Sequence, residues 1–135
     1  MVDQNCAYCV EGDLVAKFGI KICELETSKV YLFKEQSHPG RCIVAHKKHV
    51  GDMNELTAEE RAAYFEDVAR VARAIMAAFN PDKVNYGAYG DTGHHLHFHL
   101  CPKYKDEYEW GGVFLMNPDK KYLTDAEYAE MIEKI

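Results

Sequence analysis

The residues of this chain best suited to chemistry are three histidines, His95, His97 and His99, which alternate with apolar residues. In an extended strand successive side chains point to opposite faces, so the three imidazoles would share one face at intervals of about 7 Å. A hydrophobic core disfavours three polar rings that each need a hydrogen-bond partner. The row therefore predicts a surface that faces a ligand, a metal ion or water.

Two kinds of chemistry suit such a row. Imidazoles bind zinc readily, which favours a metal site. In phosphoryl chemistry one unprotonated imidazole attacks phosphorus while its neighbours hold the phosphate oxygens. Crowding lowers the pKa of each ring, because a second positive charge nearby is unfavourable, and this keeps a nucleophile unprotonated near neutral pH. Both interpretations stay open at this point.

A second pair with chemical potential is Cys6 and Cys9, a Cys-x-x-Cys near the N-terminus. A structural zinc site would need two further ligands, because such sites are tetrahedral with all four positions filled. A redox role is the second interpretation, although the βα context typical of redox motifs is missing here. A pair of loop cysteines without a role is the third.

The strands that must position these residues are indicated by runs rich in β-branched and aromatic side chains. Such runs occupy residues 19–25, 29–33, 41–45, 83–88 and 95–101. Thr27-Ser28 predicts a hairpin turn between the first two, and Pro102 is expected to end the last. The apolar residues between the histidines would then pack on the core.

Helices are indicated by a change of period. From Thr57 onward apolar residues recur at steps of 3 and 4, which predicts a helix of about six turns that ends at Asn80-Pro81. This apolar stripe consists of Phe65, Val68, Ala72, Ile75 and Phe79. Thr57 with Glu60 forms a capping box, and Thr124 with Glu127 predicts a short C-terminal helix. The expected fold is α+β, a mostly antiparallel sheet of about five strands covered by one long helix.

Length and composition bound the class of protein. The chain has 135 residues, 47% hydrophobic and 28% charged, which fits one globular domain over residues 1–135. The net charge of −6 disfavours nucleic acid as a partner, because phosphate-backbone binding needs a basic surface. No apolar run approaches the ~18 residues of a membrane span, and none resembles a secretory leader. The odd number of cysteines, five, then predicts a reducing, cytoplasmic location.

The segment from Asn85 to Pro102, which contains the three histidines, resembles the histidine triad (HIT) superfamily of nucleotide hydrolases and transferases. The segment from Gly40 to His49 is similar to a second block of that family. The resemblance implies a HIT-like fold and a homodimer whose two sheets join into one. It also implies a small-molecule nucleotide substrate in a cleft beside the triad, and a mechanism that demands no catalytic metal.

The resemblance implies a role for each residue of the triad. His97 would attack the α-phosphorus of a nucleotide and form a covalent nucleotidyl-histidine, from which water releases the nucleoside monophosphate. His99 would hydrogen-bond the phosphate, and His95 would support the site. Thr92 stands where the family commonly has a hydroxyl near the leaving group.

The nucleotide-binding residues are implied in the same way. Asn85 and Gly90 would present polar and backbone groups to the phosphate, or would form a turn and no more. Glu35 is the expected ribose ligand, because the family normally has an aspartate after an apolar pair in this region. Arg41 stands where many members have a histidine, and its fixed charge would either bind phosphate or lie on the surface.

Family members with an N-terminal cysteine pair often hold a structural zinc ion. They use a histidine after the third strand and the first histidine of the triad as the other two ligands. The resemblance therefore implies a zinc site made of Cys6, Cys9, His49 and His95.

Together these features predict a nucleotide phosphohydrolase or nucleotidyl transferase acting on a nucleoside phosphoramidate or dinucleoside polyphosphate. Three other classes stay open. A non-enzymatic nucleotide sensor would bind without turnover, a metal-dependent phosphodiesterase would need its metal, and a zinc-stabilised interaction protein would bind no nucleotide. The intact His97 favours an enzyme, and the lack of an acidic cluster near the triad disfavours the phosphodiesterase.

Overall fold

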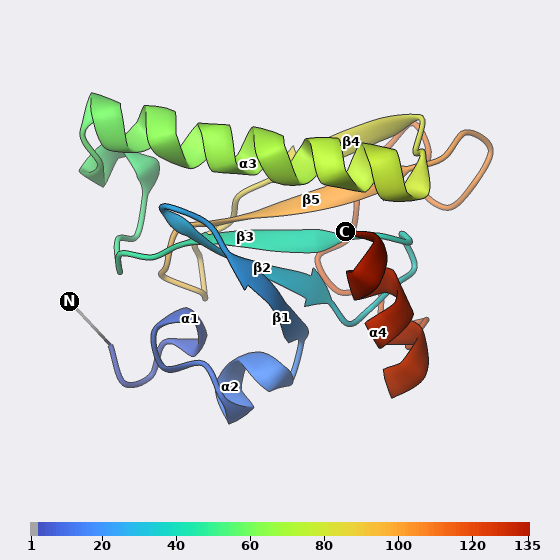
Figure 1. The fold of residues 1–135 in the computed structure, drawn as a ribbon, viewed down its shortest axis with the longest axis horizontal. Helices are drawn as coiled ribbons and strands as arrows, with labels where there is room; N and C mark the ends of the chain where they lie inside the picture. Colours follow the sequence, from blue (N-terminus) through green and yellow to red (C-terminus); the bar gives the residue numbers. More distant parts are fainter. Residues whose placement is uncertain (1–2) are drawn as a thin grey trace.

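A five-stranded antiparallel sheet carries the histidines, as the computed structural model of residues 3–135 shows (Figure 1). Its strands are β1 (Gly19–Glu24), β2 (Ser28–Phe33), β3 (Cys42–His46), β4 (Lys83–Gly87) and β5 (His97–Lys103). They lie in the order β1-β2-β3-β5-β4, and each neighbouring pair is antiparallel. The predicted α+β fold is confirmed, and β5 lies between β3 and β4.

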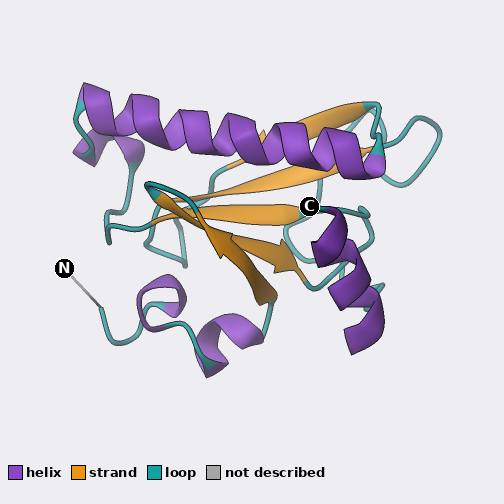
Figure 2. Ribbon diagram, viewed as in Figure 1, coloured by secondary structure: helices purple, strands orange, loops and turns teal. Residues whose placement is uncertain are grey.

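Helices cover both faces of this sheet (Figure 2). The long helix α3 (Ala58–Phe79) runs along one face, and the short helices α1 (Ala7–Val10) and α2 (Asp13–Ala16) lie on the opposite side. A 3-10 turn, η1 (Met53–Glu55), precedes α3, and α4 (Asp125–Lys134) follows the last loop. Three of these elements, α1, α2 and η1, were not predicted, because three or four residues are too few to show a period.

Alternation along the strands divides the apolar residues into two cores. Val30, Leu32 and Val44 point toward α3 and join its buried face and Leu100 of β5. The intervening residues point to the other side, where Tyr8 and Val15 of the N-terminal helices pack against Tyr31, Phe33, Ile43 and Ala45. The N-terminal segment therefore folds over the face of the sheet that carries the histidines.

The long helix begins and ends as predicted. The Thr57 side chain accepts a hydrogen bond from the Glu60 amide, Glu60 returns the capping bond, and Asn80 closes the helix in the left-handed conformation at φ 48°. Val68, Ala72 and Ile75 are buried as predicted, whereas Phe65 is 38% exposed and its neighbour Tyr64 is buried instead. The Tyr64 hydroxyl donates to the Val44 carbonyl, which turns this side of α3 toward the sheet.

The last strand lies two residues later than predicted. It begins at His97, so His95 belongs to the bend before it, and it continues through Pro102 to Lys103. Pro102 pairs with Val84 of β4, whereas pairing with β3 extends only as far as Leu100. The proline is tolerated because β5 has a neighbour on only one side at that point.

Two further observations concern the whole described range. No helix within residues 3–135 combines the length and the apolar character that crossing a membrane requires. All five cysteines carry free thiols, with Cys42 and Cys101 buried and Cys23 exposed.

Candidate active site

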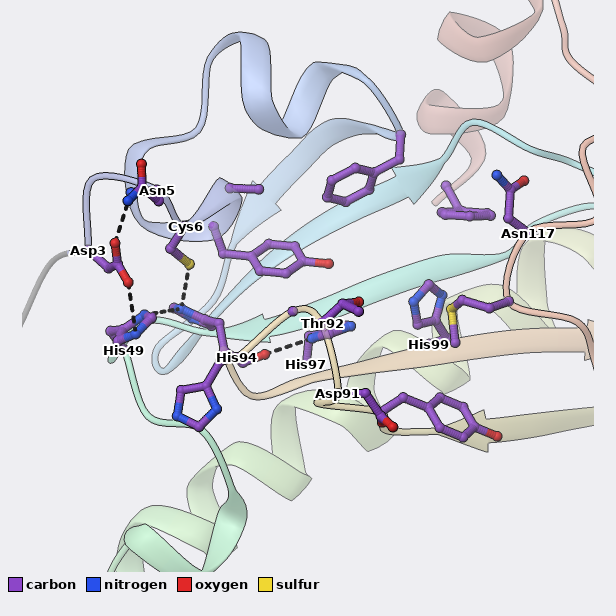
Figure 3. Close-up of a pocket in the computed structure, with 18 residues that line it drawn as sticks. Asp3, Asn5, Cys6, His49, Asp91, Thr92, His94, His97, His99 and Asn117 are labelled. Carbon is purple, nitrogen blue, oxygen red and sulfur yellow. Dashed lines mark hydrogen bonds and ion pairs between the residues drawn. The ribbon is translucent and has the colours of Figure 1, made fainter.

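A cavity of about 590 Å³ opens over the histidine-bearing face of the sheet. All three triad histidines line it, and their side chains are between 2% and 8% exposed. Figure 3 shows His97 and His99 side by side in this space, with Thr92 close by and Asn117 at the far end. The structure therefore brings the row together in one open cleft, although His95 precedes the regular strand.

The ring of His97 is held by its own chain. Its Nδ1 lies 2.7 Å from the carbonyl oxygen of His95. A carbonyl can only accept, so Nδ1 carries the proton and Nε2 of the neutral ring carries the lone pair. Burial lowers the pKa of His97, which favours that neutral form.

The ring of His95 is also held by a backbone carbonyl, but through its other nitrogen. Its Nε2 donates to the carbonyl oxygen of His46 over 2.6 Å, which leaves the lone pair on Nδ1. That Nδ1 lies 3.2 Å from Cys6 Sγ, 3.6 Å from Cys9 Sγ and 3.1 Å from His49 Nδ1. Burial is the main reason that the pKa of His95 is lowered, to about 4.

The four side chains around this point fit a zinc ion. The ligand atoms of Cys6, Cys9, His49 and His95 all lie within 4.8 Å of one another. Tetrahedral zinc with sulfur and nitrogen ligands separates those atoms by about 3.3 to 3.8 Å, close to the contacts seen here. The lone pair of His95 is aimed at the two sulfurs, as a metal ligand requires. The predicted four-residue set is thus assembled as a cluster that could bind a metal.

The other predicted residues of the triad region are spread around the cleft. Thr92 lines the main cavity. Gly90 lines a smaller neighbouring cavity of about 160 Å³, which His97 also borders. Asn85 pairs with Cys101 across β4 and β5 and so belongs to the same face of the sheet, but it lines neither cavity.

Glu35 does not line the cleft. Its carboxylate is buried and already accepts hydrogen bonds from the amides of Ser37, Lys120 and Lys121 and from the Ser37 hydroxyl. Those bonds lower the pKa of Glu35 against the opposing effect of its burial. One carboxylate oxygen accepts from the Ser37 amide, and the other accepts from the Ser37 hydroxyl and from the two lysine amides of the loop before α4. The ribose role of Glu35 stays a prediction.

Arg41 is neither a surface residue nor part of the cavity wall. Its side chain is fully buried, and its guanidinium donates to Nδ1 of His99 over 3.0 Å. It also donates to the carbonyls of Leu115 and Met116 over 3.0 and 2.9 Å. The prediction that Arg41 lies on the surface is wrong, because the residue is buried behind the triad and touches a triad ring. Phosphate binding by its charge stays a prediction.

Several residues that line the cleft were not predicted. Tyr8 packs on the triad, with ring centroids 5.0 Å from His97 and 5.4 Å from His95. Its position between Cys6 and Cys9 could have indicated this, because a cluster that includes both cysteines and His95 brings the tyrosine close to the triad. Phe33, Met116 and Asn117 also line the cavity, and no local pattern marks them.

Comparison with known proteins gives consistent results. The family model described as HIT domain matches residues 19–106. The Bacillus subtilis protein named Protein hit is 29% identical over 92% of this chain and 88% of its own length. The Schizosaccharomyces pombe adenosine 5'-monophosphoramidase hnt1 is 28% identical over 79% of this chain and 80% of its own.

A third relative and a solved structure complete the comparison. The Dictyostelium discoideum bis(5'-adenosyl)-triphosphatase is 28% identical over 69% of this chain, and the match spans 65% of that relative. The crystal structure of a histidine triad protein from Marinobacter aquaeolei superposes with a TM-score of 0.83. That match has 21% identity and covers 92% of this chain and 90% of the other, which supports the fold.

Proposed function

The chain belongs to the HIT domain family, and on that premise we propose that it is a nucleotide phosphohydrolase or nucleotidyl transferase. The observation that carries the proposal is the bond from His97 Nδ1 to the His95 carbonyl, because it leaves Nε2 with a lone pair inside a nucleotide-sized cleft. A neutral imidazole prepared in this way is a nucleophile at neutral pH.

The first step is attack on the α-phosphorus. The lone pair of His97 Nε2 forms a P–N bond, and the bond between phosphorus and the leaving group breaks. The leaving group departs with that electron pair and takes up a proton from water, either directly or through the Thr92 hydroxyl, which receives a proton from water as it gives its own. His99 hydrogen-bonds the phosphate, and His95 supports His97 through its carbonyl.

The second step is hydrolysis of the nucleotidyl-histidine. A water oxygen forms a new P–O bond, the P–N bond breaks, and the electron pair returns to Nε2 of His97. One proton of the water passes to solvent, and the nucleoside monophosphate leaves. Another nucleophile in place of water would make the same protein a transferase.

The substrate class we propose is a nucleoside phosphoramidate or a dinucleoside polyphosphate. Two relatives at 28% identity are named for an adenosine phosphoramidate and a bis-adenosyl triphosphate. Asn85 and Gly90, on the same side of the sheet as the triad, would assist phosphate binding. A non-enzymatic nucleotide sensor is the alternative, and it would bind the same compounds without turnover.

The test is a substrate panel assayed with wild-type protein and His97→Ala. We expect wild type to release nucleoside monophosphate, and the variant to lose more than about 10³-fold in kcat, since no other group can form the covalent bond. His97→Gly with added imidazole is the control, because free imidazole can replace a missing nucleophile but not a missing structural contact. Turnover that persists in His97→Ala would overturn the assignment.

Trapping the intermediate separates an enzyme from a sensor. A slow substrate or rapid acid quench should give wild-type protein a mass increase of one nucleoside monophosphate, located on the peptide that contains His97. A sensor would show saturable binding without that adduct at any quench time.

We also propose a structural zinc ion at Cys6, Cys9, His49 and His95, where the donor atoms and their spacing suit it. Bound there, zinc would supply a cross-link between the N-terminal segment and the sheet. The ligands stand behind His97, whose ring is held by the His95 carbonyl. We therefore expect monophosphate release to survive brief chelation.

We propose further that residues 1–135 form one domain and pair as a homodimer through the β4 edge of the sheet. β4 is the edge strand next to β5, and Tyr86 and Tyr89 beside it are 52% and 51% exposed. Pairing of β4 with its copy would make the two sheets continuous. Light scattering at several concentrations tests this, and a monomer at assay concentrations would contradict it.

A further inference from the structure

We propose that Arg41 is a positioning residue that fixes His99 as a permanent hydrogen-bond donor to the substrate phosphate. The inference rests on the proposed function for its substrate, but its physical content concerns one buried contact. That contact joins Arg41, the residue just before β3, to His99 in β5, behind the wall of the cleft.

The contact decides which nitrogen of His99 carries the proton. A guanidinium can only donate, so Nδ1 of His99, 3.0 Å from Arg41 Nη2, must accept with its lone pair. The proton of the neutral ring is therefore on Nε2. Nε2 makes no hydrogen bond to any of the residues that the structure describes, and the ring lines the cleft, so this donor is available to a ligand.

Arg41 is held firmly enough to impose that choice. Its guanidinium lies between two aromatic rings, 4.2 Å from the centroid of Phe33 and 4.8 Å from that of Phe114. The backbone carbonyls of Leu115 and Met116 accept further hydrogen bonds from it. Within residues 3–135 no carboxylate forms an ion pair with it, although Glu35 and Glu109 are near enough to favour its charge.

The surroundings of His99 also exclude the charged ring. From β3 the permanent charge of Arg41 faces it, and from β5 His97 lies with its ring centroid 5.4 Å away. The other packed elements present Phe33 and Phe114, so no acidic group faces the ring. Burial, followed by Arg41 and His97, lowers the pKa of His99 to about 2.

Two neighbouring imidazoles therefore have opposite tautomers. His97 is held by an acceptor and offers a lone pair, whereas His99 is held by a donor and offers a proton in a hydrogen bond. Because His99 has no second proton to give, it stabilises phosphate charge without acting as a general acid. The proton for the leaving group must then come from Thr92 or water.

The decisive measurement needs no substrate. Nitrogen-15 spectra of the histidine rings, with His99 identified by comparison with His99→Gln, should show a neutral ring protonated on Nε2 from pH 5 to 8. A His99 ring that is protonated on Nδ1, or that takes up a proton near pH 6 to 7, would overturn the proposal even if the protein proves to be an active hydrolase.

Two variants distinguish the charge and the hydrogen-bond donor of Arg41 from its packing. Arg41→Met keeps the aliphatic part of the side chain but removes the charge and the hydrogen-bond donor. The pKa of His99 should then rise while burial still holds it below the ordinary value, and the ring should lose its fixed Nε2–H tautomer. We expect kcat to fall about 100-fold, the usual loss for one oxyanion donor, and the acid side of the kcat profile to move to higher pH. Arg41→Lys keeps a charge and a donor and should retain the Nε2 tautomer, with kcat within about 10-fold of wild type.

The matched control is Arg73→Met, an exposed arginine on α3 paired only with Glu66. It should leave the His99 spectrum and the pH profile unchanged. If Arg41→Met folds and turns over with His99 still neutral and protonated on Nε2, Arg41 is not what fixes the ring. If no substrate is turned over by any variant, the spectra still decide the inference while the proposed function fails.

Discussion

Identical side chains in the cleft perform different tasks because each meets a different partner. His95 donates from Nε2 to the His46 carbonyl, which leaves its lone pair on Nδ1, on the side of the cysteines. His97 donates from Nδ1 to the His95 carbonyl, which leaves its lone pair on Nε2. The Arg41 guanidinium gives His99 the tautomer opposite to that of His97, with the proton on Nε2. The nitrogen that carries the proton in each ring is therefore set by the hydrogen-bond partner of that ring.

The sequence could predict only part of this. Alternation correctly placed the three rings on one face, because that depends on residues next to one another. The contact between Arg41 and His99 could not be predicted. The carbonyls that hold Arg41 in place belong to Leu115 and Met116, which follow it by 74 and 75 positions in the chain. The donors to Glu35 could not be predicted for the same reason, because Lys120 and Lys121 are distant from it in the chain.

Tyr8 gives a prediction at the scale of one residue. Its ring is buried against His97, Tyr31 and Phe18, while its hydroxyl makes no hydrogen bond within residues 3–135. Tyr8→Ala should lower the free energy of unfolding by about 3 kcal/mol and raise KM, because a wall of the cleft is lost. Denaturant unfolding and steady-state kinetics measure both.

Tyr8→Phe is the matched control, since it keeps the ring and removes only the hydroxyl. It should differ from wild type by less than about 0.5 kcal/mol in stability. A large loss in Tyr8→Phe would show that the hydroxyl, and not the ring, supports the site.

Elements with long periods or paired caps were predictable, and short ones were not. The helix from Ala58 to Phe79 and the one from Asp125 to Lys134 both begin at a threonine with a glutamate three residues later, and both capping boxes are confirmed. Helix α1 has four residues and no side-chain cap at Cys6. Its position depends on contacts with distant residues, so its own sequence does not specify it.

Removing the metal should therefore destabilise α1 before the rest of the fold. We expect purified wild-type protein to contain about one zinc ion per chain. A chelator should lower its unfolding free energy by about 4 kcal/mol relative to zinc at a thousandfold its Kd. Hydrogen exchange should quicken in α1 and remain slow in α3, because α3 packs on the other core.

Cysteine variants provide the control for this experiment. Cys9→Ser should lose the zinc, whereas Cys23→Ser, an exposed cysteine on β1 outside the cluster, should keep it. Equal zinc content in both variants would contradict the assigned ligands.

At the scale of the whole molecule, the sheet is the frame on which segments distant in the chain meet. The cleft takes residues from the N-terminal helices, from β5 and the loop before it, and from the loop before α4. Composition and charge predicted the class of protein, and periodicity predicted the sheet and α3. That the N-terminal segment and the loop before α4 both line the cleft could be seen only in the structure.

Global stability should respond to acid through His99. Its pKa is about 2 in the folded protein and near 6.5 when unfolded, so only the unfolded chain takes up the proton as pH falls below 6.5. Stability is therefore complete above pH 6.5 and decreases below it, by about 2.5 kcal/mol at pH 4.5 for this one group.

Denaturant unfolding of wild type and His99→Gln from pH 7.5 to 4.5 isolates that contribution. Glutamine does not titrate, and its amide oxygen can still accept from Arg41, so the variant should lose less stability over this range. Parallel curves for the two proteins would show that His99 is protonated equally in the folded and unfolded states.

The seating of Arg41 has a consequence for biosynthesis. Ribosomes deliver a chain from its N-terminus, so the cysteines and His49 emerge well before the carbonyls of residues 115 and 116. His95 and His97 are also synthesised before residues 115 and 116, so a nascent chain can hold its metal ligands and its nucleophile while the Arg41 guanidinium still lacks two of its acceptors. Among these groups, the phosphate donor of His99 is therefore the last to be fixed.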